Sequence, residues 1–206
     1  MSITVRHPVR ASIEDGASFM EHLIQEYPRL LDDWAESTNT KFQDEAKRIA
    51  NGDYEVYRSI MSQQWRALED NDFRKDIFYK SMLIATYSYY ERMLCKLAEV
   101  SEKPKQIIKS ILEKTGKELS KEAKKNVRYI DKNTRIIRNE LVHNNTGKPR
   151  NENKIKTIIN KWPEITFDDN IISITDDKFI IDSLQKELFV LNELCNILNY
   201  KHKLIK

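Results

Sequence analysis

The run Arg138-Asn139-Glu140-Leu141-Val142-His143, called the Arg–His run below, carries the side chains that are best suited to chemistry. An arginine guanidinium can hold a phosphate through two parallel hydrogen bonds and neutralise its charge. Histidine can exchange a proton near neutral pH, and the amide of Asn139 can orient a polar group. The run therefore suits proton transfer at a phosphate. The structural alternative is an ion-pairing surface arginine followed by a histidine that caps a helix.

A helix over 120–143 has to position the Arg–His run. Its expected core face repeats at spacings of three and four, as one side of an α-helix does, and consists of Val127, Ile130, Thr134, Ile137 and Leu141. Ser120 is a suitable helix start, and the Asn-Asn-Thr-Gly run at 144–147 tolerates the conformations that end helices. On a regular helix His143 lies about 140° around the axis from Arg138. The two side chains are then expected to flank a groove rather than touch.

Positive charge gathers around the same helix. Residues 101–150 contain 14 Lys or Arg against 6 Asp or Glu, whereas residues 11–60 contain 5 against 11. A basic segment beside an acidic one favours a face that meets a polyanion. The candidate phosphate contacts are Arg135, Lys125, Lys132 and Asn144. The alternative for the charged residues among them is a solvated surface without a ligand.

The other segments predict further helices and one hairpin. Apolar residues recur at helical spacing over 17–35, 42–50, 54–69, 74–99, 104–115 and 177–200, with a break at 51–53. In the first segment these residues are Phe19, Leu23, Tyr27, Leu30, Leu31 and Trp34. Alternation of apolar and polar residues over 165–175, around Asp168-Asp169-Asn170, predicts a small β-hairpin. We therefore expect an all-α fold, an antiparallel helical bundle with a small β-hairpin inserted before the last helix.

Composition bounds the class of protein. Residues 1–70 are expected to form an N-terminal helical extension that packs on a bundle of residues 71–206. Four Gly and five Pro in 206 residues argue against an all-β sandwich. No window has 18 uninterrupted apolar residues, and the N-terminus lacks the apolar segment of a secretory signal. A cytoplasmic protein without a membrane partner is expected.

The sequence lacks the residues that several classes of functional site require. No His pair, Cys-x-x-Cys or acidic cluster has metal-ligand spacing, and the sequence has no Gly-rich phosphate loop or Gly-x-Ser-x-Gly. We therefore expect neither a metal nor a cofactor. Cys95 and Cys195 each lie inside an amphipathic apolar run and are interpreted as small buried hydrophobes.

The Arg–His run resembles the Arg-x(4–6)-His motif of the HEPN family (higher eukaryotes and prokaryotes nucleotide-binding domains). In that motif a polar residue often follows the arginine, as Asn139 does here. The order of elements over about 74–200 is also similar: a long helix with an inward acidic residue, a later helix that ends in the motif, and a closing helix. The run Tyr87-Ser-Tyr-Tyr-Glu91 looks like the second core helix of the family, which makes Glu91 the candidate acidic residue. The hairpin is similar to insertions in some members.

The resemblance implies a metal-independent endoribonuclease that works as a homodimer with its active site at the interface. The RNA 2′-hydroxyl attacks the adjacent phosphate and leaves a 2′,3′-cyclic phosphate and a 5′-hydroxyl. In this chain His143 would be the general acid–base, Arg138 would hold the phosphate and Asn139 would orient it. Glu91 would hold Arg138 or a partner residue in place, and the candidate phosphate contacts would bind RNA.

HEPN enzymes of this kind often serve as toxins or antiviral effectors, so a cognate antitoxin or a defence-system partner protein is a further expectation. Some HEPN toxins carry, two residues after the histidine, a tyrosine that a partner nucleotidyltransferase modifies. This chain has Asn145 there, which puts such control in question. Two alternatives stay open: a HEPN-like module that binds RNA, nucleotide or a partner protein without catalysis, and a purely structural helical adaptor.

Overall fold

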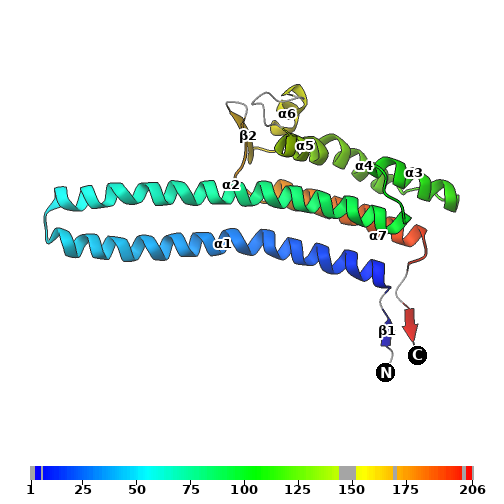
Figure 1. Cartoon of the computed structure of the whole chain (residues 1–206), viewed down its shortest axis with the longest axis horizontal. Coiled ribbons are helices and arrows are strands. Elements are labelled where there is room, and N and C mark those ends of the chain that lie inside the picture. The colour runs from blue at the N-terminus through cyan, green and yellow to red at the C-terminus, as the bar shows by residue number, and fades with distance from the viewer. Residues whose placement is uncertain (1–2, 6, 144–151, 169–170, 201–202, 206) are drawn as a thin grey trace.

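The structure, a computed structural model, describes residues 3–5, 7–143, 152–168, 171–200 and 203–205. It confirms the expected all-α bundle with a small antiparallel hairpin directly before the last helix (Figure 1). The helices are α1 Pro8–Ala50, α2 Tyr54–Ala98, α3 Pro104–Thr115, α4 Lys121–Tyr129, the π-helical turn η1 Ile130–Thr134, α5 Arg135–His143, α6 Glu152–Ile159 and α7 Lys178–Ile197. Across these described ranges, no helix combines the length and apolarity needed to cross a membrane.

The two longest helices, α1 and α2, form one antiparallel hairpin. The predicted break at 51–53 is confirmed, because Asn51 and Gly52 have left-handed backbones with φ of 44° and 89°. Asp53 then starts α2 by accepting hydrogen bonds from the backbone N–H groups of Glu55 and Val56 at 2.9 and 3.1 Å. α1 and α2 also run through residues 36–41 and 70–73, which lie between the segments with helical spacing. Those stretches contain one apolar residue, Phe73, and no glycine or proline, so the helix continues through them.

The helices lie in layers on either side of α2. In Figure 1, α1 runs along one side of α2, while α3, α4 and α5 run along the other, and α7 packs against α2, α1 and α4. The end of the α1–α2 hairpin at the turn 51–53 projects beyond the remaining helices (Figure 1), and this part of α1 and α2 is called the arm. The expected boundary at residue 70 falls inside α2, which carries the chain from the arm into the bundle without a break.

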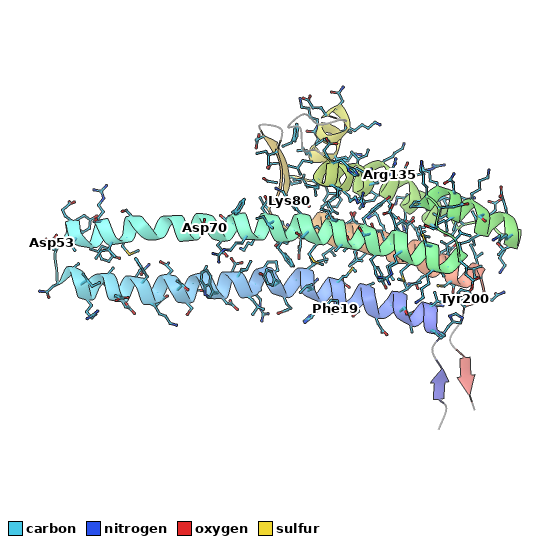
Figure 2. The ribbon with its side chains drawn as sticks, in the orientation of Figure 1. Phe19, Asp53, Asp70, Lys80, Arg135 and Tyr200 are labelled. Carbon is cyan, nitrogen blue, oxygen red and sulfur yellow. The ribbon has the colours of Figure 1, made fainter. Side chains whose placement is uncertain are left out.

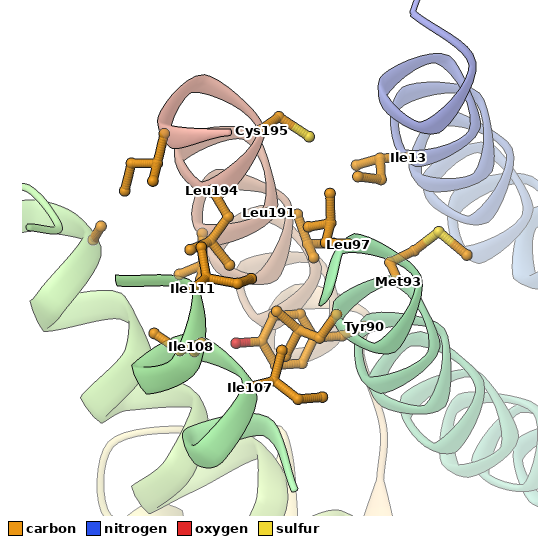
Figure 3. Close-up of a cluster of buried hydrophobic side chains, with 14 of the residues drawn as sticks. Ile13, Tyr90, Met93, Leu97, Ile107, Ile108, Ile111, Leu191, Leu194 and Cys195 are labelled. Atoms are coloured by element: carbon orange, nitrogen blue, oxygen red, sulfur yellow. The ribbon is translucent and has the colours of Figure 1, made fainter. Parts of the chain in front are cut away.

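Buried apolar side chains form two clusters. The first joins the last part of α2 to α3, α4 and α7, and Figure 3 shows Tyr90 and Leu97 of α2 facing Ile107, Ile108 and Ile111 of α3 and Leu191 and Leu194 of α7, with Met93 on the side towards α1. The second joins the middle of α2 to α5, α6, α7 and the hairpin, with Leu83, Ile137 and Phe179 fully buried. This arrangement follows from the spacing of large aliphatic residues at intervals of three and four, which gives each helix one apolar side. The basic helix is thus fixed to α2 and α7 by its apolar side.

Two small sheets complete the fold. β2 (Ile165–Asp168) pairs antiparallel with β3 (Ile171–Ile174), which confirms the predicted hairpin, and Asp169 and Asn170 at its tip lie outside the described residues. The Oδ1 atom of Asp76 accepts a hydrogen bond from the Ile174 backbone at 2.7 Å and so ties the hairpin to α2. β1 (Ile3–Val5) pairs antiparallel with β4 (Lys203–Ile205) and brings the two ends of the chain together. Neither this pair nor α6 is predicted from the sequence.

Most of the apolar residues that predict the first helix do not form its buried side, although Leu23 packs against the second cluster. Phe19, Leu30 and Trp34 are 66%, 58% and 48% exposed. The buried side of α1 instead consists largely of small residues together with two isoleucines: Ile13, Ala17, Ile24, Pro28, Ala35, Ala46 and Ala50. Alanine has a short side chain, so it allows α1 to approach α2 closely where a larger residue would not.

Two truncations one and a half turns apart in α1 test this assignment. Ile24→Ala removes a fully buried side chain and is expected to lower the free energy of unfolding by about 2–5 kcal/mol. Leu30→Ala removes an exposed side chain of similar size and is expected to change it by less than about 0.5 kcal/mol. Urea denaturation of both variants makes the comparison. Equal losses would contradict the burial described here.

Candidate active site

The helix that carries the Arg–His run is preceded by a wider turn. η1 interrupts the predicted regular helix over 120–143, and the Arg135 N–H bonds to the Ile130 carbonyl five residues back. Thr134 in this turn is fully buried, and its Oγ1 hydrogen-bonds to Oγ of the equally buried Ser183 of α7 at 3.0 Å. A π-turn changes the direction in which the following side chains point, and such turns are frequent at functional sites. Spacings of three and four in the sequence do not reveal the change.

Arg138 is held on the inner side of α5. Its side chain is 20% exposed, and its Nη1 donates to Oδ1 of Asn139 at 3.0 Å. Its Nη2 lies 4.0 Å from Oε2 of Glu91, too far for a hydrogen bond but close enough for attraction. The guanidinium carbon lies 5.6 Å from the centre of the Tyr87 ring, within range of a cation–π contact. Residues from α2 and α5 thus fix the position of this cation.

These contacts leave Arg138 and Asn139 with more hydrogen-bond donors than acceptors. A guanidinium can only donate, so the bond between them uses the amide oxygen of Asn139 and leaves its NH₂ group as a donor. The Nε atom of Arg138 is buried without an acceptor among the described residues. A cluster of donors with one positive charge attracts an anion with several acceptor oxygens, such as a phosphate.

The structure brings together some of the expected site residues and separates others. Glu91, Arg138 and Asn139 lie together, and Arg135 lies one turn before Arg138 with its guanidinium paired to Asp131 at 2.9 Å. His143 is the last residue of α5 and is exposed. α5 is a regular α-helix, so His143 lies about 7.5 Å along the axis and about 140° around it from Arg138. The expectation that the two flank a groove stays a prediction.

The other candidate phosphate contacts lie on the basic outer surface. Lys125 of α4 is exposed and pairs with Glu122 at 3.6 Å, and Lys132 of η1 is exposed. Figure 2 shows Arg135 in the layer of α4 and α5, across α2 from α1. Asn144 and Asn145 lie outside the described residues. Over the same described part of the chain, no three His, Cys, Asp or Glu side chains gather in a way that could hold a metal ion.

Glu187 of α7 is a residue near the site that the sequence analysis missed. It is 1% exposed, and neither of its carboxyl oxygens has a hydrogen-bond partner among the described residues. Burial raises its pKa well above the ordinary value, and the nearby carboxylate of Glu91 raises it further. The signal was available, because Glu187 follows Leu184 by three residues and precedes Leu191 by four, on the apolar face of its helix.

Burial of Glu187 predicts a pH-dependent stability that Glu187→Gln removes. Near and below the ordinary pKa of 4.5, the folded and unfolded chains both keep the proton. Above that pH the unfolded chain loses it and the folded chain does not, so wild type loses up to about 1.4 kcal/mol per pH unit until the raised pKa is passed. The advantage of Glu187→Gln over wild type is therefore expected to grow from pH 5 to pH 8 in urea denaturation.

The exposed Glu113 of α3 provides the control. Glu113→Gln is expected to change stability by a small amount that is similar at pH 5 and at pH 8. An advantage of Glu187→Gln that stays constant across this range would show that the carboxyl is ionised in the folded protein.

Comparison with known proteins identifies no family for this chain. No family model matches the chain, and neither the curated proteins nor the solved structures give a match. The resemblance to HEPN domains stays a prediction that is carried by the Arg–His run and the order of helices.

Proposed function

We propose that the chain is a metal-independent endoribonuclease of the HEPN type that acts as a homodimer. The observation that carries this proposal is the donor cluster of Arg138 and Asn139, held beside Glu91 and Tyr87 on a helix that ends in an exposed histidine. The cluster suits a phosphodiester, and the histidine supplies the proton transfer that its cleavage needs. The basic surface of α4 and η1 suits a polyanionic substrate.

The proposed reaction breaks one phosphorus–oxygen bond and forms another. The RNA 2′-oxygen attacks the adjacent phosphorus as its proton passes to one copy of His143. The bond from phosphorus to the 5′-oxygen breaks, and that oxygen takes a proton from solvent, to which His143 then returns the proton it accepted. The products are a 2′,3′-cyclic phosphate and a 5′-hydroxyl. Arg138 and Asn139 donate to the phosphate oxygens, whose negative charge rises in the transition state.

The positions of the two residues on α5 support a dimer. One straight helix presents Arg138 and His143 on different sides, so one copy alone does not surround a phosphate. Two α5 helices related by a two-fold axis perpendicular to them would run antiparallel across a cleft, with the arginine of each copy near the histidine of the other. Glu91 serves as a positioning residue, because its contact is with Arg138.

The proposed biological role is that of a toxin or antiviral defence effector in the cytoplasm, where an antitoxin or defence-system partner protein controls it. An enzyme that cleaves RNA by such a general mechanism harms the cell that makes it, so control by a partner is expected. A growth test in cells that express the chain with and without its genomic neighbour addresses this role separately from the chemistry.

The chemistry is tested by substitution of the two proposed catalytic residues. Arg138→Ala and His143→Ala are each expected to lower the rate of RNA cleavage by at least about 100-fold, because each removes a group that acts in the transition state. The matched controls are Arg29→Ala and His22→Ala, an exposed arginine and an exposed histidine of α1. Both controls are expected to keep cleavage within about threefold of wild type.

End-group analysis of the products completes the test. Wild type is expected to leave 2′,3′-cyclic phosphate and 5′-hydroxyl ends, and to do so in the presence of a chelator. Cleavage that survives either alanine variant, or that a chelator stops, would falsify the mechanism. Binding of RNA without any cleavage would instead favour a non-catalytic module.

A mixing experiment tests whether the active site lies between two chains. Arg138→Ala and His143→Ala are each inactive alone, but a mixed dimer keeps one intact arginine facing one intact histidine. Refolding the two variants together at equal amounts is expected to restore about a quarter of wild-type activity, since half of the dimers are mixed and each has one of two pairs. Absence of any recovery in dimers of proven mixed composition would contradict a shared site.

The outer cations are expected to affect affinity more than rate. Lys125→Ala, Lys132→Ala and Arg135→Ala are each expected to weaken binding to RNA of any sequence and to reduce the slope of log affinity against log salt by about one. The control is Lys41→Ala, an exposed lysine of α1 within the acidic segment 11–60. Affinity measurements at several salt concentrations in the His143→Ala background decide the result. An unchanged slope would show that the substituted residue does not contact the RNA phosphates.

A further inference from the structure

A cavity of about 440 Å³ lies beside the Arg–His run, between α2, α3 and the helix formed by α4, η1 and α5. Glu91 and Asn139, the two residues whose polar atoms contact Arg138, both line it. A cavity of this size is large enough for a small organic ligand. Whatever occupies it is therefore one side chain away from the proposed phosphate position.

One part of the cavity wall is apolar and aromatic. Ile108 and Ile130 belong to the core and are 6% and 3% exposed, and Val127 is half-buried beside them. The rings of Tyr87 and Tyr90 line the side formed by α2, and Figure 3 shows the Tyr90 hydroxyl directed towards Ile108. Both tyrosines are packed into the core and are 2% exposed, so this wall offers a flat ligand an apolar surface rather than an open ring face.

The same cavity also offers hydrogen-bonding groups that can read the edge of a ring. The amide oxygens of Gln106 and Asn139 already accept hydrogen bonds, from the Lys103 N–H at 3.4 Å and from Arg138 at 3.0 Å. The NH₂ groups of both amides are therefore the donors, and the carboxylate of Glu91 is the acceptor. An aliphatic ligand would strip these groups of water without replacing its hydrogen bonds. The edge of a nucleobase carries both donors and acceptors, so it satisfies groups of both kinds.

The charges of the lining favour a ligand with an attached anion. Lys103, Lys105 and Arg135 line the cavity against the two carboxylates of Glu91 and Asp131. Asp131 pairs with Lys105 at 2.6 Å and with Arg135 at 2.9 Å, so these two cations are held in place beside the opening. One positive charge is in excess, which suits a base that carries a phosphate.

We propose that this cavity binds the nucleobase of the nucleotide next to the scissile phosphate. The inference rests on the proposed ribonuclease function. With the base against the apolar wall of Ile108, Val127 and Ile130, the ribose leads past Glu91 and Asn139 towards Arg138. The cavity then determines the position of the cut and the preferred base beside it.

Binding of mononucleotides tests the proposal without any need for cleavage. The wild-type protein is titrated in a calorimeter with the four nucleoside 3′-monophosphates and with ribose 5-phosphate, which has no base. At least one nucleotide is expected to bind roughly 5- to 150-fold more tightly than ribose 5-phosphate. Val127→Phe fills the cavity and is expected to abolish that difference, whereas Val9→Phe, a half-buried valine of α1 outside the cavity, is expected to keep it.

A second variant guards against loss of folding. Gln106 is exposed at the start of α3, so Gln106→Ala is expected to fold, to reduce the advantage of the preferred nucleotide by roughly fivefold and to leave ribose 5-phosphate unaffected. Equal affinity for all five ligands in wild type, or base-dependent binding that survives both cavity variants, would overturn the proposal.

Cleavage assays separate this proposal from the ribonuclease function. If wild type cleaves RNA and Val127→Phe keeps the same base preference at the cut, the cavity proposal fails and the ribonuclease stands. If wild type binds mononucleotides through the cavity but cleaves no RNA, the ribonuclease fails and base binding stands. Loss of base preference at the cut in Val127→Phe, with the His22→Ala control unchanged, supports both.

Discussion

The second half of α2 is the surface on which the rest of the molecule depends. It contacts α1, α3, α5, α7 and the hairpin strand β3, so every layer of the fold is placed by reference to it. About one turn of this helix presents Tyr87, Tyr90 and Glu91 to the basic helix and to the cavity. Because the same residues pack the core and face Arg138, the geometry of the candidate site is fixed as firmly as the core itself.

Polar groups that are buried beside the second half of α2 lower the stability of the fold. Glu187 lies among apolar side chains without a hydrogen-bond partner in the described structure, and burial keeps Tyr87 and Tyr90 protonated by raising the pKa of each hydroxyl. An apolar residue at 187 would cost nothing in desolvation, so the carboxyl lowers stability where it stands. Such a cost is common beside sites of function and uncommon in cores that serve packing alone. It is a physical reason, separate from the Arg–His run, to place function at this end of the bundle.

The sequence predicts what depends on local pattern and misses what depends on contact. The three-and-four spacing finds Ile130, Thr134 and Ile137 as the core side of the basic helix, and alternation finds the hairpin. It does not find η1, since Thr134 reaches Ser183 across 49 residues of sequence and no local pattern records that bond. It gives no warning that Phe19 and Leu30 are exposed, because an apolar stripe looks the same whether or not a partner covers it. Arg138 and Glu91 are paired through the family resemblance; spacing alone does not connect residues on two helices.

The alanine-rich contact between α1 and α2 has a consequence for motion. Towards the turn at 51–53, α1 presents Ala35, Ala46 and Ala50 to its neighbour, and the other helices no longer accompany it. Each of these buries little area, so the free energy that holds the arm closed falls along its length. The arm is thus held less firmly towards the turn at 51–53 than where it joins the bundle. Because α2 continues unbroken from Tyr54 to Glu91, a displacement of this end would act directly on the helix that carries Glu91.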